Sequence, residues 1–143
     1  RLPFRSITVM VQKEAAERLC APVGSREAGA VTVAVQYYAQ AEKLFSVSRG
    51  SFLPAPNVDS AVIRLQIRQA PAVALTDEKK FFRMVKAAFG QRRKTALNAI
   101  SAGMALPKGD VAAALEAAGL EGNVRAEKLS MEELAALCEA LPG

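Results

Sequence analysis

The residues Ile7-Thr8-Val9-Met10-Val11 form a short and nearly continuous run of apolar and β-branched side chains. Such a run predicts a strand that is covered on both faces, as in a parallel α/β sheet. Residues 13–20 follow it with the pattern of a helix. A buried strand needs neighbouring strands, and no earlier strand precedes this one in the sequence. The sequence also begins at Arg1 rather than at Met. We therefore expect the chain to be a piece of a longer protein.

Two further strands are predicted in the first half of the chain. Residues 61–68 alternate, so that the odd-numbered side chains face a core and the even-numbered ones face outward. Residues 44–47 are compatible with a shorter strand. Residues 31–35 also alternate, but residues 28–38 would serve equally well as a buried helix, and periodicity alone does not decide between the two. Pro54 and Pro56 exclude a regular element between the two later strands.

The second half of the chain is predicted to be helical after a linker at residues 70–76. One helix begins after Thr76 or Asp77 and extends to about residue 89, a second follows Gly90, and two more are predicted at 110–118 and 130–141. The first helix has an apolar stripe that consists of Phe81, Phe82, Val85, Ala88 and Phe89. The predicted fold class is therefore α/β followed by α.

The composition excludes several kinds of site. The 143 residues contain no histidine, which excludes Ser-His-Asp and Cys-His nucleophile systems and histidine-bound zinc. The two cysteines, Cys20 and Cys138, lie far apart, so neither a disulfide framework nor a Cys-x-x-Cys metal site is expected. No apolar run approaches the roughly 18 residues of a membrane span. We expect a reduced, cytoplasmic protein that binds no metal and no membrane.

Basic residues concentrate in the middle of the chain. The net charge is +5, but residues 77–109 hold eight basic and two acidic side chains, whereas residues 110–143 hold two and seven. Such a block predicts a surface that binds a polyanion, and its alternative is an ordinary solvated helix face. The best candidates are Arg92, Arg93 and Lys94, which are predicted to begin a helix and to combine charge with free backbone N–H groups. Weaker candidates on the preceding helix are Lys79, Lys80, Arg83 and Lys86.

Three segments resemble the rRNA adenine N6-dimethyltransferase family. Residues 8–18 look like a late strand of the family's sheet and the helix after it. Residues 33–62 contain Gln36-Tyr37-Tyr38 and then match the family's F-x-P-x-P-x-V-D-S-A-V pattern from Phe52 to Val62. The third segment, residues 87–95, is similar to the family's A-A-F-x-Q-R-R-K-T.

The resemblance implies a Rossmann-like class I methyltransferase sheet and a small all-helical domain. Residues 1–70 would be the C-terminal part of the S-adenosylmethionine-dependent domain, and residues 71–143 a helical RNA-binding domain. The implied partners are small-subunit rRNA in the pre-30S particle and the missing N-terminal half of the same protein. In this family Phe52 would pack on the extruded target adenine, with Pro54 and Pro56 holding its ring in place.

The cofactor side of the family is missing from the sequence. The glycines never form G-x-G, and Arg1-Leu2-Pro3-Phe4 matches the catalytic N-[LI]-P-[YF] signature falsely, because Arg replaces Asn. We therefore assign no catalytic and no cofactor-binding residue to this segment and expect it to be inactive alone. Tyr37 and Tyr38 are expected to be core or wedge residues rather than stacking platforms.

Two other classes of function remain open from the sequence. The chain could be a stand-alone nucleic-acid-binding module without enzymatic activity, in which Gly90 marks the turn of a helix-turn-helix. It could also be an interaction protein that uses its acidic last helices.

Overall fold

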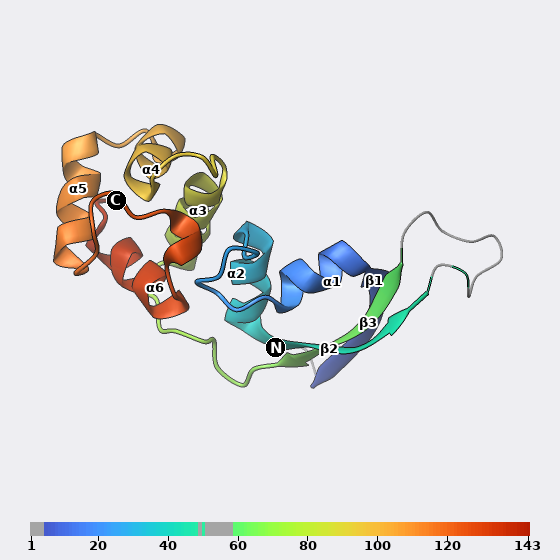
Figure 1. Ribbon diagram of the computed structural model, residues 1–143. Coiled ribbons are helices and arrows are strands. Elements are labelled where there is room, and N and C mark those ends of the chain that lie inside the picture. The colour runs from blue at the N-terminus through green and yellow to red at the C-terminus, as the bar shows by residue number, and fades with distance from the viewer. Residues whose placement is uncertain (1–4, 49, 51–58) are drawn as a thin grey trace.

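The computed structural model describes residues 5–48, 50 and 59–143. The sheet-bearing part contains β1 (Ser6–Gln12), α1 (Lys13–Cys20), α2 (Ala30–Tyr38), β2 (Ala39–Val47) and β3 (Ser60–Ile67). It is followed by α3 (Glu78–Phe89), α4 (Ala96–Met104), α5 (Lys108–Ala117), the short 3-10 helix η2 (Ala126–Lys128) and α6 (Met131–Ala140). Figure 1 shows the later helices gathered at one end of the molecule, with α2 between them and the sheet. The predicted substrate-pocket residues Phe52, Pro54 and Pro56 and the segment 1–4 lie outside the described residues.

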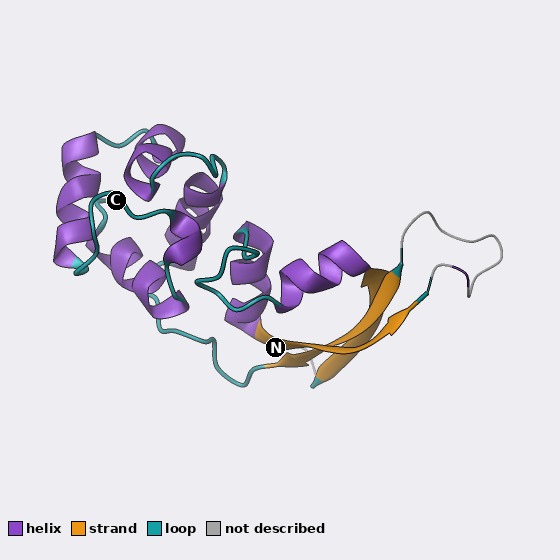
Figure 2. Ribbon diagram, viewed as in Figure 1, coloured by secondary structure: helices purple, strands orange, loops and turns teal. Residues whose placement is uncertain are grey.

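The three strands form one sheet in the order β1-β3-β2, in which both pairings are antiparallel (Figure 2). The prediction of parallel pairing for β1 is therefore wrong for the described sheet. The physical reason is the crossover: α1 and α2 carry the chain from β1 to β2, which run in the same direction but do not pair. Strand β3 enters the gap between them in the opposite direction, so that Ile63 pairs with both Val9 and Lys43.

Strand β1 is exposed, contrary to the prediction that it is covered on both faces. Helix α1 covers one face of the sheet, where Ala16, Ala61 and Ile63 form a small core. Yet Ile7 is 39% and Met10 52% exposed, and no strand among the described residues pairs with the outer edge of β1. An open edge of this kind is a template for pairing with another strand.

Residues 31–35 belong to a helix, which settles the ambiguity that the sequence left. The Thr32 hydroxyl accepts a hydrogen bond from the backbone N–H of Gly29 at 3.0 Å and donates one to the Arg18 carbonyl at 2.7 Å. The Gln36 amide donates to the carbonyls of Leu19 and Ala21. These bonds satisfy backbone carbonyl oxygens at the C-terminal end of α1 and hold α2 against α1.

The main hydrophobic core lies among the later helices, and every described element after residue 70 is helical. Helix α3 is capped by Asp77, which accepts from the Lys80 backbone N–H, and the predicted capping box of Ser130 and Glu133 begins α6. Four members of the predicted α3 stripe are buried, but Phe82 is only half-buried and Met84 is buried in addition. Val33 and Tyr37 of α2 also belong to this core.

A clasp ties the segment before α3 to the last helix. The Glu139 carboxylate accepts hydrogen bonds from the backbone N–H of Thr76 at 3.0 Å and from its hydroxyl at 2.8 Å. These bonds lower the pKa of Glu139 from its ordinary value of 4.5, with the backbone N–H as the largest cause.

The clasp predicts a pH-dependent stability. Because the pKa of Glu139 is lower in the folded protein, its stabilisation is present above pH 4.5 and is lost as the pH falls through the folded pKa. Unfolding by urea, measured from about pH 7 to about pH 3, should show the difference between wild type and Glu139→Gln shrinking at the acid end. A difference that stays constant over this interval contradicts the assignment.

Helices α3 and α4 approach each other closely at Gly103. A Cβ on Gly103 would lie 2.5 Å from the Ala87 Cβ and 3.0 Å from its Cα. Since real Cβ atoms do not come this close, any larger residue must push the helices apart.

Gly103→Ala should therefore lower the free energy of unfolding by about 1–3 kcal/mol. Gly109→Ala is the matched control, since a Cβ on Gly109 meets nothing within 4 Å and alanine favours the helix α5. Chemical denaturation of both variants tests the contact. Equal stability of the two variants would show that the helices are not in close contact.

Candidate nucleic-acid interface

One face of α3 presents cations around an aromatic ring. Lys79, Phe82, Arg83 and Lys86 stand at positions i, i+3, i+4 and i+7 and so share one face of the helix. Together with Asp77 they line a shallow, open hollow. Within the described part of the chain, the side chains of the three cations form no hydrogen bond and no ion pair, and all three are exposed. They are therefore available to phosphates.

Lys80 differs from the other cations of α3. Its ammonium donates a hydrogen bond to the Leu141 carbonyl, at the end of α6. The side chain thus satisfies a backbone carbonyl oxygen at the C-terminal end of a helix, which is a structural role. The structure does not bring Lys80 together with the exposed cations.

The segment Arg92-Arg93-Lys94 forms a turn and not the start of a helix, so this prediction is wrong. Helix α4 begins at Ala96, because Thr95 caps it by accepting from the Asn98 backbone N–H at 3.3 Å. The Ala96 N–H is bound to the Val124 carbonyl at 2.8 Å, and the Lys94 N–H to Gln91 at 3.0 Å. These two N–H groups therefore already have partners within the protein and are not available to an anion.

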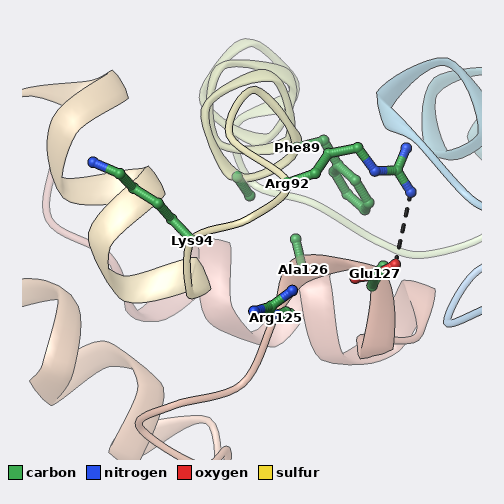
Figure 3. A pocket seen from close by; sticks show the side chains of 7 residues that line it. Phe89, Arg92, Lys94, Arg125, Ala126 and Glu127 are labelled. Carbon is green, nitrogen blue, oxygen red and sulfur yellow. Dashed lines mark ion pairs between the residues drawn. The ribbon is translucent and has the colours of Figure 1, made fainter. Parts of the chain in front are cut away.

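Arg92 links three parts of the molecule. Its Nη2 donates to the carbonyls of Arg26 at 2.8 Å and Ala28 at 3.1 Å, both in the loop between α1 and α2. The same nitrogen lies 3.7 Å from the Glu127 carboxylate of η2, an ion pair drawn in Figure 3. The Nη2 group of Arg92 is thus bound to partners within the protein.

Arg93 and Lys94 keep their charges free. Both are exposed, and neither side chain has a hydrogen bond or ion pair with any residue that the structure describes. Figure 3 shows Lys94 extending away from the pair of Arg92 and Glu127. The nearby Arg125 is exposed and lines a small pocket together with Arg92 and Lys94. Sequence analysis missed it because it lies in the net acidic end of the chain.

A groove between α3 and α4 lies beside the cations of α3. It has a volume of about 540 Å³. Its lining includes Arg83, Lys86, Gly90, Gln91, Gly103 and Met104. Its lining thus combines two cations with several small residues. The arrangement fits a sugar–phosphate backbone, which is bound by shape and charge.

The described residues offer little for catalysis. Burial raises the pKa of both the Cys20 and the Cys138 thiols, so neither is an activated nucleophile. No group of three or more cysteine, aspartate or glutamate side chains in this part of the chain could hold a metal ion. None of its helices is long and apolar enough to cross a membrane.

The two arginines of the turn should behave differently on substitution. Arg92→Ala removes hydrogen bonds from a charged donor and should cost about 1.5–3 kcal/mol of unfolding free energy. Arg93→Ala removes an exposed side chain without partners and should change it by less than about 0.5 kcal/mol. Denaturant titration of both variants measures the contrast. Similar losses in the two would contradict the role given to Arg92.

Comparison with known proteins identifies the family. The family described as "Ribosomal RNA adenine dimethylase" matches residues 1–142. The "Ribosomal RNA small subunit methyltransferase A" of Geobacillus thermodenitrificans is 49% identical over 146 residues, covering 99% of this chain and 49% of that protein. Its namesake from Desulfitobacterium hafniense is 48% identical over 136 residues, covering 95% and 49%. The chain thus spans about half the length of the curated relatives it matches.

Solved structures agree in fold. A dimethyladenosine transferase from Plasmodium falciparum matches with a TM-score of 0.71 at 22% identity, over 96% of this chain and 57% of that one. The 23S rRNA methyltransferase ErmE matches with a TM-score of 0.65 at 26% identity, over 96% and 55%. Because each match covers 96% of this chain, both include the sheet as well as the helices. On the strength of the family match over nearly its whole length, the chain belongs to the ribosomal RNA adenine dimethylase family.

Proposed function

We propose that this chain is the C-terminal half of an rRNA (adenine-N6,N6-)-dimethyltransferase that transfers methyl groups from S-adenosylmethionine to adenines of small-subunit rRNA. The observation that carries the proposal is the family match over residues 1–142, combined with relatives about twice as long. The match includes the sheet, which a stand-alone helical module would not need. The parent protein would act on the pre-30S particle in the cytoplasm.

The described residues do not fit the methyl donor. A donor site in a sheet of this type needs a glycine-rich turn after a strand, where the backbone can approach the cofactor closely. Here β1 passes into α1 from Gln12 to Lys13 without any intervening residue. We therefore place the donor site in the preceding half of the protein and expect this chain to be inactive alone.

The substrate side is proposed to lie at one edge of the sheet. Gln12 at the end of β1 and Val47 at the end of β2 both pair with Ser60, so the carboxyl ends of these two strands meet. Ligands of open α/β sheets bind at the carboxyl ends of strands. The segment with Phe52, Pro54 and Pro56 leaves from this edge, which supports its proposed role in the adenine pocket.

Methylation of adenine N6 suits a protein without histidine. The N6 lone pair is conjugated with the ring, so the enzyme must position the extruded base and stabilise its charge rather than supply a histidine base. Residues 1–70 would contribute to that pocket, while residues 71–143 would hold the RNA. The residues that contact the RNA would be Arg93, Lys94, Lys79, Arg83 and Lys86. Arg92 and Lys80 would hold the structure of this surface through their hydrogen bonds within the protein.

The experiment uses the longer protein that contains this chain and small-subunit particles lacking the methyl groups. Mass spectrometry should detect N6,N6-dimethyladenosine after incubation with S-adenosylmethionine. The variant with both Arg93→Ala and Lys94→Ala should bind the rRNA more weakly, and the slope of log affinity against log salt should fall by about 1.4–1.8, since each phosphate contact contributes about 0.7–0.9.

Lys108→Ala is the control, because it removes an equally exposed charge from α5. It should leave affinity and salt slope unchanged. Absence of dimethyladenosine with the wild-type protein would refute the proposed reaction. An unchanged salt slope in the double variant would refute the proposed RNA surface.

A further inference from the structure

Two adjacent tyrosines at the end of α2 have different surroundings. Tyr37 is 1% exposed, and its hydroxyl donates to the Glu78 carboxylate at 2.6 Å, so the prediction of a core residue is confirmed for it. Tyr38 is 48% exposed, so it is not a core residue. An aromatic side chain left half open to water is a large apolar surface that invites a ligand.

The ring of Tyr38 is nevertheless held in place by its neighbours. Its centroid lies 6.0 Å from that of Phe82, with 26° between the planes, which is a stacked arrangement. The Tyr37 ring meets it at 4.8 Å and 81°, edge to face. Tyr37 also meets Phe82 at 5.5 Å and 88°. A ring fixed by two others costs little conformational entropy when it binds a planar group.

Free cations lie beside Phe82, the α3 member of this aromatic group. Phe82 shares its helix face with Lys79, Arg83 and Lys86 and lines the same hollow. By helix geometry, these cations extend over about 10 Å along the α3 axis. The nearby acids have other partners: Asp77 caps α3, and Glu78 accepts from Tyr37. Positive charge beside an exposed ring is the arrangement with which proteins bind unpaired nucleotides.

We propose that Tyr38 and the hollow beside Phe82 bind an unpaired nucleotide of the RNA, with its base stacked on Tyr38 and its flanking phosphates on Lys79, Arg83 and Lys86. This inference rests on the proposed function, because it takes the ligand of the basic surface to be RNA. A paired helix would satisfy the cations but would leave the ring exposed, since stacked bases are not accessible to it.

This nucleotide is not the one that is methylated. Tyr38 precedes Ala39, the first residue of β2, whereas the proposed adenine pocket follows Val47 at the other end of that strand. Nine residues of strand separate the two places by about 30 Å. The site would therefore hold a second, non-reacting nucleotide and fix the position of the RNA on the enzyme.

The test uses the longer protein and an oligoribonucleotide of about ten pyrimidines with one central 2-aminopurine, single-stranded or paired with its complement. Stacking on Tyr38 should quench the fluorescence of the single-stranded probe. Tyr38→Leu keeps an apolar contact with Phe82 but removes the ring, so it should lose the quenching and bind this probe about tenfold more weakly. Tyr38→Phe should keep both, and Lys108→Ala, which removes an exposed charge from α5, should match wild type.

The paired probe distinguishes this site from the general RNA surface. The variant with Arg93→Ala and Lys94→Ala should weaken binding of both probes, whereas Tyr38→Leu should weaken only the single-stranded one. Wild-type quenching in Tyr38→Leu, or equal losses for the two probes, would overturn the proposal and leave the proposed function standing. Thermal melts followed by circular dichroism will check that the variants are folded. With folded variants, loss of quenching in Tyr38→Leu and its retention in Tyr38→Phe support the proposal.

Discussion

Helix α2 is the element on which the arrangement of the molecule depends, because it must pack on two sides at once. On the sheet side, Thr32 and Gln36 bind the carbonyls at the end of α1. On the other side, Val33 and Tyr37 enter the main core, and Tyr37 binds Glu78 of α3. A polar contact on one side and an apolar one on the other leave α2 little freedom to rotate. Arg92 adds a third link by binding the loop that leads into α2.

This constraint explains how RNA-binding and substrate-binding parts can work together. The cations of α3 and of the turn before α4 lie on the helical side, while the carboxyl ends of β1 and β2 lie at the sheet. An RNA held by the proposed basic surface presents its reacting adenine to the proposed pocket at the strand ends only if the relative position of the two parts is fixed. Positioning of the reacting groups can supply a large part of an enzyme's rate enhancement. The shared core of α2 and α3 is therefore part of the proposed function and not only of stability.

The sequence predicted the features whose causes are local. Residues 13–20 were predicted as a helix with the bounds of α1, and the capping box at Ser130 was found, because both depend on neighbouring residues. Pairing in the sheet depends on β3 entering from far along the chain, so the antiparallel partner of β1 in the described sheet was not predicted. Among the basic residues, sequence could not separate Lys80 and Arg92 from Arg93 and Lys94. The difference comes from distant carbonyls, at Leu141 and at Arg26, that only the fold brings near.

The surface of the sheet gives an independent reason to expect a covering partner. A bulge between Lys43 and Phe45 places Phe45 opposite Val62, which also pairs with Met10, so an apolar row crosses all three strands. Helix α1 packs on the other face, and Met10 and Phe45 are 52% and 55% exposed. Apolar rows and open strand edges are liabilities that proteins cover. The proposed preceding half would pair with β1 and bury this row, and it would do so beside the strand ends where the substrate side is proposed. One missing partner thus accounts both for the exposed sheet and for the absent donor site.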